Sequence, residues 1–266
     1  MLQLKPLMAE IRKIHINNFF SIGVIFSMLI WPILSYYTAY YTYAPFDLSS
    51  VAKYGIYDFN SLMVFIITGI LGYYCFWAMV QSAWMMSYER ESGTLEVIMS
   101  TPANRLSIIY GRALGSLVEN IWMFAAFSLM IIWLNSDFRW DLLITVPIAF
   151  VFLTVSAVVW GGLLNAIFLF SRDATFLFDV FDTPMELFSG SKIPVASFPL
   201  WARILSAIFP LSYCLVLLRD IFANRPIDWA NTLILLGILL ILILATVVII
   251  KFAERNNRRK GSFTFY

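Results

Sequence analysis

The chain has 266 residues, of which 61% are apolar and 13% are charged, whereas soluble domains are about half apolar and a quarter charged. This composition excludes a water-soluble globule and predicts one polytopic, all-α membrane domain over residues 1–266. The formal net charge of +2, with basic residues mainly at loop edges and near the C-terminus, gives no reason to expect a nucleic-acid-binding face.

The first 17 residues predict an amphipathic helix at the membrane surface. Their apolar side chains recur at spacings of three and four, as Leu4, Leu7, Met8, Ile11 and Ile14. This pattern is typical of a helix that lies in the membrane interface. Such a helix can serve as a simple anchor or can contact a cytoplasmic partner, and the sequence leaves both open.

Six apolar runs predict six membrane-spanning helices, because a span needs about 20 mostly apolar residues. The runs cover residues 18–41, 62–85, 108–134, 142–170, 174–190 and 229–250. The first run is too long for the apolar core of a cleaved signal, so we expect it to remain as a membrane anchor.

The basic residues predict the orientation of these spans. With the N-terminus inside, 12 of the 18 Lys and Arg residues fall in inner segments, and four of the other six lie in segment 191–228. Lys and Arg are enriched in short cytoplasmic loops, and long segments follow this rule weakly. We therefore expect both termini in the cytoplasm.

Segment 191–228 predicts a broken structure on the outer side. It is fairly apolar, and it is interrupted by Pro194, Pro199, Pro210 and Pro226, so it cannot form one straight helix. Two short helices, 200–209 and 211–222, are expected between the prolines. Because both ends lie outside, the pair predicts a re-entrant hairpin that the protein shields from lipid.

The cytoplasmic loop 86–107 is the most charged stretch of the first half of the chain. Gly93 is expected to end a helix, Thr94 to cap a short new one, and Thr101 with Pro102 to begin another. The short helix would carry both acidic and apolar side chains: Glu89, Glu91, Leu95, Glu96, Ile98 and Met99. An ordinary helix cap with solvated charges is the alternative.

Two sequence runs resemble those of a known family. The run 89–96, Glu-Arg-Glu-Ser-Gly-Thr-Leu-Glu, closed by Thr101 and Pro102, resembles the loop after the second span in permeases of type-2 ATP-binding-cassette (ABC) exporters. Residues 187–190 with Pro194, and residues 209–213 with Leu218 and Arg219, resemble that family's fifth-span exit and external hairpin. Together with the six spans, the resemblance covers nearly the whole chain.

The resemblance implies half of a transporter in a bacterial or archaeal inner membrane. The partners would be two cytoplasmic ATPase subunits on separate chains and a second permease, identical or related. ATP and Mg²⁺ would bind to the ATPase, and this chain, which lacks the Gly-x-x-x-x-Gly-Lys-Ser/Thr phosphate loop, would hold neither. The coupling residues implied for the loop are Glu89, Arg90, Glu91, Gly93, Thr94 and Glu96.

The fifth predicted span carries Asp179, Asp182 and Glu186, spaced three and four residues apart, which places them on one helical face. Ionised acids cost about 2.5–3.5 kcal/mol each near the bilayer centre, so this face must meet protein, water or the membrane boundary. It can border a path for a cationic or amine-bearing substrate, or take up protons. Alternatively, it pairs with cations such as Arg172, Lys192 or Arg219.

Neither a metal site nor a catalytic site is expected, because Cys75, Cys214 and His15 are isolated from one another. The leading prediction is ATP-driven export of an amphipathic drug, peptide or glycolipid. A secondary transporter or channel that uses the acidic face is the alternative, but it leaves the charged loop helix unexplained. A membrane enzyme acting on lipid-linked substrates is a third class, disfavoured because the acids lie within a span.

Overall fold

The computed structural model describes residues 3–19, 22–45, 48, 52–135, 139–168 and 174–260. Within these residues the chain is helical and forms no strand, which confirms the predicted all-α class. The elements in chain order are α1 Leu4–Phe19, α2 Ile22–Tyr43, η2 Ala52–Tyr54, α3 Phe59–Glu91, α4 Thr94–Ser100, α5 Arg105–Ala113, η3 Leu114–Ser116, α6 Leu117–Asn135, α7 Leu142–Phe168, α8 Ala174–Phe188, η4 Val195–Ser197, α9 Leu200–Ser206, α10 Pro210–Phe222 and α11 Trp229–Lys260.

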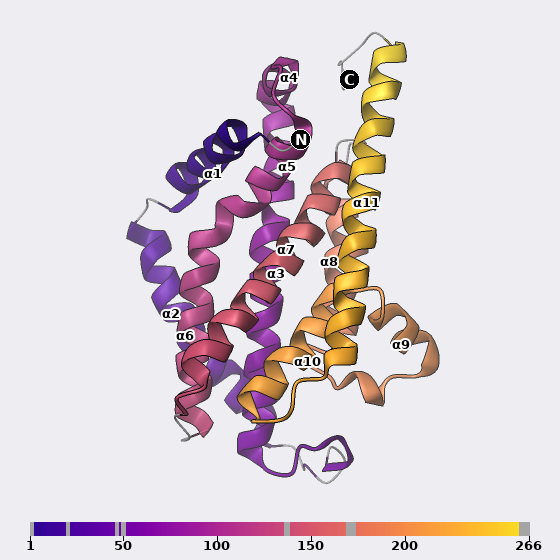
Figure 1. Cartoon of the computed structure of the whole chain (residues 1–266). Helices are drawn as coiled ribbons and strands as arrows, with labels where there is room; N and C mark the ends of the chain where they lie inside the picture. The colour runs from indigo at the N-terminus through magenta and orange to yellow at the C-terminus, as the bar shows by residue number, and fades with distance from the viewer. Residues whose placement is uncertain are drawn as a thin grey trace.

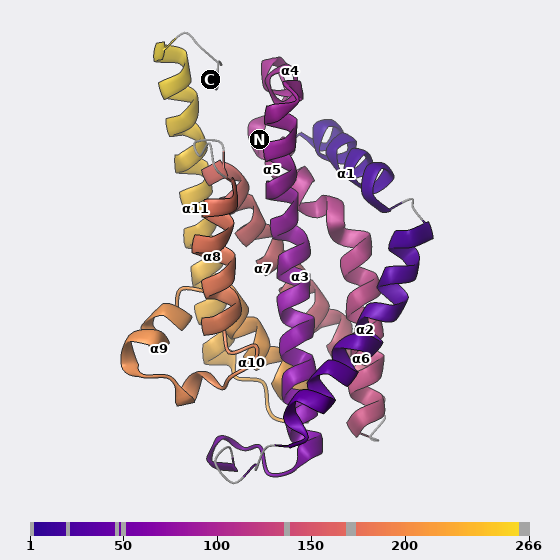
Figure 2. The ribbon, with the colours of Figure 1, turned by 180° about the vertical axis from the view of Figure 1, so that it is seen from behind.

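Helix α3 is the centre of the bundle and packs against α2, α6, α7, α8 and α10 (Figure 2). Its interior-facing side chains are fully buried, among them Ile67, Leu71, Cys75, Phe76 and Met79. With 33 residues, α3 is about 50 Å long, whereas the apolar layer of a bilayer is about 30 Å thick. The excess length carries its C-terminal end, and α4 after it, beyond the thickness of a membrane.

Within the part of the chain that the structure describes, four helical stretches are long and apolar enough to cross a membrane: Phe59–Ser82, Arg105–Leu134, Leu142–Phe168 and Trp229–Phe252. A fifth is reached if the bent pair α9 and α10, which meet at 87°, counts as one span. Helix α8 has 15 residues in the described part, fewer than the roughly 20 that a span needs. That α2 and α8 also cross the membrane, which would give six spans, therefore remains a prediction.

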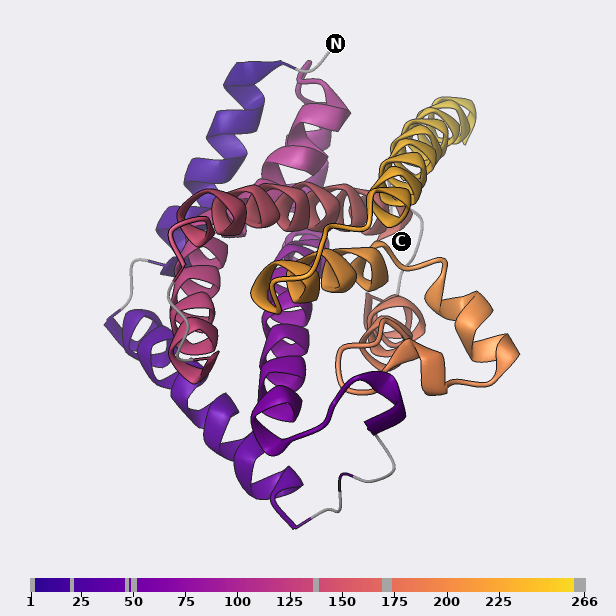
Figure 3. The ribbon, with the colours of Figure 1, turned by 60° about the horizontal axis from the view of Figure 1, so that its bottom comes forward.

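The two ends of the bundle differ in what they carry. Helices α1 and α4 and the C-terminal end of α11 lie at one end, and η2 lies at the other (Figure 1). Helix α1, at the place where an interfacial helix is expected, crosses the bundle obliquely rather than running along it. Seen from the opposite end, α2 and α8 lie on different sides of α3 (Figure 3).

Two glycines let α1 pack closely on α5 and η3. A Cβ atom at Gly111 would lie 2.8 Å from the carbonyl oxygen of Leu7, and one at Gly115 would lie 2.7 Å from the side chain of Ile14. Any larger side chain at these positions would push the helices apart. The predicted span 108–134 lies within the stretch Arg105–Leu134, which includes the 3-10 turn η3, and α1 packs on the first part of this stretch.

The segment between α8 and α11 is fixed to the bundle by Arg219 of α10. Its guanidinium lies 3.6 Å from the centre of the Phe65 ring and donates hydrogen bonds to the carbonyl oxygens of Phe65 at 3.2 Å and Gly190 at 2.8 Å. The helices α9 and α10 occupy the places expected for the two short helices. They are joined by a sharp bend at Phe209 and Pro210.

Candidate functional site

The loop after α3 folds as a short, separate helix. Gly93 has a φ of +71°, a left-handed conformation that glycine adopts without steric cost, and it lets the chain turn sharply between α3 and α4. Helix α4 then comprises seven residues and projects from the end of the bundle (Figure 1). Leu95 anchors it through a fully buried side chain, whereas Val97 is 67% exposed.

Two predicted caps of this loop are wrong. Gly93, not Thr94, is the N-cap of α4, and the Thr94 hydroxyl donates back to the carbonyl oxygen of Glu89 in α3 at 3.2 Å. Thr101 ends α4 rather than beginning another helix. The next helix, α5, is capped by Asn104, whose side chain accepts from the Leu106 amide at 2.9 Å. The short side chains thus tie α4 to the end of α3.

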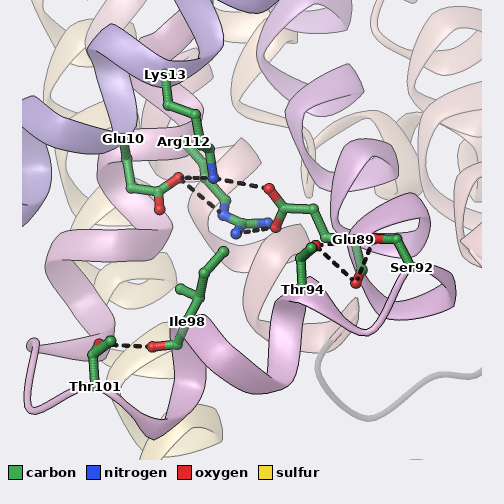
Figure 4. A network of polar contacts seen from close by, with 8 residues as sticks. All are labelled: Glu10, Lys13, Glu89, Ser92, Thr94, Ile98, Thr101 and Arg112. Carbon is green, nitrogen blue, oxygen red and sulfur yellow. Dashed lines mark hydrogen bonds and ion pairs between the residues drawn. The ribbon is translucent and has the colours of Figure 1, made fainter.

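A network of ion pairs holds the base of this loop (Figure 4). Glu89 at the end of α3 pairs with Arg112 of α5 and, at 2.8 Å, with Lys13 of α1. Lys13 also pairs with Glu10 at 2.7 Å, and the Arg112 Nε lies 3.4 Å from the same Glu10 carboxylate. Charges from three helices are therefore joined next to α4.

Arg112 is the most enclosed member of the network. Its side chain is 2% exposed, so its charge is stable only because carboxylates lie beside it. The sequence alone did not indicate this role, because Glu89 lies 23 residues away from Arg112 along the chain. The position of Arg112 between Gly111 and Gly115, which bring α1 close, is the signal that could have revealed it.

The predicted coupling residues do not form one exposed patch. Glu89 is engaged in the ion-pair network, and Arg90 donates to the carbonyl oxygen of Phe168 at the end of α7, at 2.7 Å. Gly93 shapes the turn, with no atom within 4 Å of a Cβ built on it. Glu91 and Glu96 lie at the end of α3 and in α4, but their side chains are outside the described part of the structure.

The three acids of α8 lie in three different environments. Asp179 is exposed, whereas Asp182 is fully buried and accepts a hydrogen bond of 2.8 Å from the Tyr73 hydroxyl of α3. Glu186 forms an ion pair of 2.5 Å with Lys192. Of the cations considered from the sequence, Lys192 thus pairs with the acidic face. Arg219 bonds backbone carbonyls, and Arg172 lies outside the described residues.

Comparison with known proteins identifies the family. Residues 7–223 match the family model described as ABC-2 type transporter. The chain belongs to the ABC-2 type transporter family. A protein of Cyanophora paradoxa that carries the name putative transport permease ycf38 is 24% identical over 214 residues, which cover 80% of this chain and 71% of that protein.

Membership of the ABC-2 family makes this chain a membrane permease subunit of an ABC transporter, with ABC ATPases as its associates. The matched region includes the α4 loop, the ion-pair network and the acidic helix α8. Within the described residues, no group of three or more His, Cys, Asp or Glu side chains is arranged to hold a metal ion. Cys75 and Cys214 are buried and unbridged.

Proposed function

We propose that this ABC-2 permease is half of the membrane part of an ATP-driven exporter. Two permeases, identical or related, would enclose the path, and two separate ATPase subunits would bind ATP and Mg²⁺. The chain would cross a bacterial or archaeal inner membrane six times, with both termini in the cytoplasm and α9–α10 as an outer re-entrant hairpin.

The observation that carries this proposal is the way in which α4 is joined to the neighbouring helices. Helix α4 projects from the same end of the bundle as α1 and the C-terminal end of α11 (Figure 1). The adjacent Glu89 is joined to α1 and α5 by ion pairs, and Leu95 is buried at the base of α4. A partner that moves α4 would therefore move α1, α3 and α5 with it.

Reversing the charges of the α4 loop tests the proposal. Glu91→Lys with Glu96→Lys should release the ATPase or uncouple its hydrolysis from transport, because the partner's surface must then meet cations in place of acids. The measurements are co-purification of the ATPase and transport per ATP hydrolysed. Asp141→Lys, at the start of α7 on the opposite end, is the matched control and should leave both unchanged.

Full assembly and ordinary transport in the Glu91→Lys and Glu96→Lys variant would refute the coupling role. Transport by the purified permease without any ATPase would instead support the alternative, a secondary transporter or channel. The two results are distinguishable because the first measures a complex and the second measures the permease alone.

We further propose that the acidic face of α8 borders the path of an amphipathic substrate such as a drug, peptide or glycolipid. The exposed Asp179 supports this, since an acid at this position needs a polar or charged surface against it. Replacing Asp179, Asp182 and Glu186 by Asn or Gln should reduce export and substrate-stimulated ATP hydrolysis. Unchanged values of both would exclude this role.

A further inference from the structure

A cavity of about 350 Å³ lies between α2, the N-terminal half of α3 and the end of α8. We call it the α2–α8 pocket. Its polar lining includes Ser35, Thr38, Thr42, Tyr73, Glu186 and Lys192. The volume is in the range of about 300–1,000 Å³ that is usual for ligand sites. This pocket is large enough for a polar head group, but not for a whole lipid.

One wall of the α2–α8 pocket is a row of hydroxyl groups. Ser35, Thr38 and Thr42 follow one another at spacings of three and four on α2 and all line the cavity. Trp31 and Tyr74 also line the cavity, and their rings meet edge to face at 5.5 Å. Hydroxyl groups donate and accept hydrogen bonds, so this wall suits a ligand rich in oxygen atoms.

The opposite wall carries one cation and one anion. Lys192 and Glu186 pair at 2.5 Å, with side chains 55% and 30% exposed. Both charges are therefore accessible to a ligand in the pocket. A ligand with an anionic and a cationic group could replace the ion pair between Lys192 and Glu186 by two new ion pairs. Lys192 would pair with the anionic group of the ligand, and Glu186 with its cationic group. A simple anion would be repelled by Glu186, and a simple cation by Lys192.

The surroundings of the pocket indicate an amphipathic ligand. Trp31 and Leu34 of α2 line the cavity, and their side chains are 43% and 51% exposed. An apolar tail of the ligand could therefore lie along α2. The pocket is near Tyr43, at the end of α2 remote from α4. Tyr and Trp favour the boundary between head groups and acyl chains.

We propose that the α2–α8 pocket binds the head group of a zwitterionic amphiphile that carries a phosphate and an ammonium, as phosphatidylethanolamine does. Lys192 and the hydroxyls of α2 contact the phosphate, and Glu186 contacts the ammonium. The inference uses the proposed orientation only to assign the ligand to the outer leaflet. It does not require that the ligand be transported.

Native mass spectrometry of the full-length permease, purified in detergent with any subunits that accompany it, tests the pocket. The probes are phosphatidylethanolamine and phosphatidylglycerol, which share the phosphate but differ in the ammonium. The unchanged protein should prefer phosphatidylethanolamine. Glu186→Gln should weaken that binding about tenfold, the effect of losing one charged hydrogen bond, and should shift the preference towards phosphatidylglycerol.

Two further variants complete the test. Thr38→Trp should abolish binding of both lipids by filling the cavity. The control is Lys53→Gln, because Lys53 is an exposed cation of η2 that does not line the pocket. This variant should bind both lipids as the unchanged protein does. Equal binding of the two lipids by the unchanged protein, or undiminished binding after Thr38→Trp, would overturn the proposal. A thermal melt of each variant establishes that it is folded.

Turnover of the transporter with ATP distinguishes a transported amphiphile from one that stays bound. Release of bound phosphatidylethanolamine during ATP hydrolysis would identify it as cargo, and retention would identify it as a resident lipid; either result requires the pocket to be occupied. Failure of the exporter proposal would appear as loss of the ATPase partner. Failure of this inference would appear in lipid binding to the permease itself.

Discussion

At the scale of single residues, ionisable side chains that are buried in the molecule have polar partners on neighbouring helices. Arg112 is buried between Glu10 and Glu89, and Asp182 is buried against Tyr73. An isolated charge in a low-dielectric interior is costly, so removing one partner of such a pair is more damaging than removing the pair. The ion pairs of Arg112 and the hydrogen bond of Asp182 therefore join helices to one another.

Arg112→Met should lower the free energy of unfolding by about 3 kcal/mol, because Glu10 and Glu89 lose their buried cation and then share only the partly exposed Lys13. Denaturant or thermal unfolding of the purified permease measures this change. Adding Glu10→Gln and Glu89→Gln should recover part of the loss, since the two acids that faced Arg112 are then neutral.

The control for Arg112→Met is Lys53→Met, which removes an exposed cation and should change stability by less than about 1 kcal/mol. Equal losses from the two substitutions would show that burial of Arg112 contributes nothing. No recovery on removal of the two acids would show that packing, not charge, explains the loss.

The sequence alone predicted the charged loop, its glycine turn and the acidic face, because these depend on local spacing. It did not predict that Glu89 is engaged by Arg112 or that Asp182 meets Tyr73, since 23 and 109 residues separate these partners. The predicted helix caps at Thr94 and Thr101 were wrong for a related reason. A threonine hydroxyl can bond either helix at a junction, and the packing of α4 decides which.

At the scale of the elements, close backbone contacts fix how the helices meet. A Cβ at Gly69 of α3 would lie 1.7 Å from the carbonyl oxygen of Ser191, in the turn after α8. Gly190 in that turn has a φ of +85°, and Arg219 bonds its carbonyl oxygen. Apolar periodicity predicted the helices here, but it could not predict this contact, which depends on the absence of a side chain.

Gly69→Ala should destabilise the permease by about 1–3 kcal/mol, the usual cost of forcing extra volume into a packed contact. The matched substitution is Gly237→Ala in α11, where a Cβ would meet no atom within 4 Å. That change should be neutral, or stabilise by about 0.5–1 kcal/mol, because alanine favours a helix. The two melting temperatures give the comparison, and a loss at Gly237 equal to that at Gly69 would argue against the contact.

At the scale of the whole molecule, the arrangement of α4 at one end and η2 at the other makes the orientation measurable. Residues 56–58 precede α3, and Tyr57 among them is 78% exposed; Val97 on α4 is 67% exposed. Helix α3 connects these two regions as a single helix. If it spans the membrane, the two side chains must lie in different compartments.

The native cysteines favour this measurement, because Cys75 and Cys214 are 0% and 1% exposed and should react slowly with a thiol reagent. In intact cells, a maleimide that cannot cross the inner membrane should label Tyr57→Cys and leave Val97→Cys unlabelled. In inverted membrane vesicles the two results should be exchanged. Because the reagent and the protein are the same in both preparations, each variant is the control for the other.

Labelling of both positions from one side would mean that α3 does not cross the membrane, and it would remove the basis for placing α4 against a cytoplasmic ATPase. Labelling of Val97→Cys from outside and Tyr57→Cys from inside would reverse the orientation inferred from Lys and Arg. The expected pattern places the ion-pair network on the side where ATP is available. If the ATPase contacts α4 on that side, as proposed, its closure can be transmitted along α3 to the far end of the bundle.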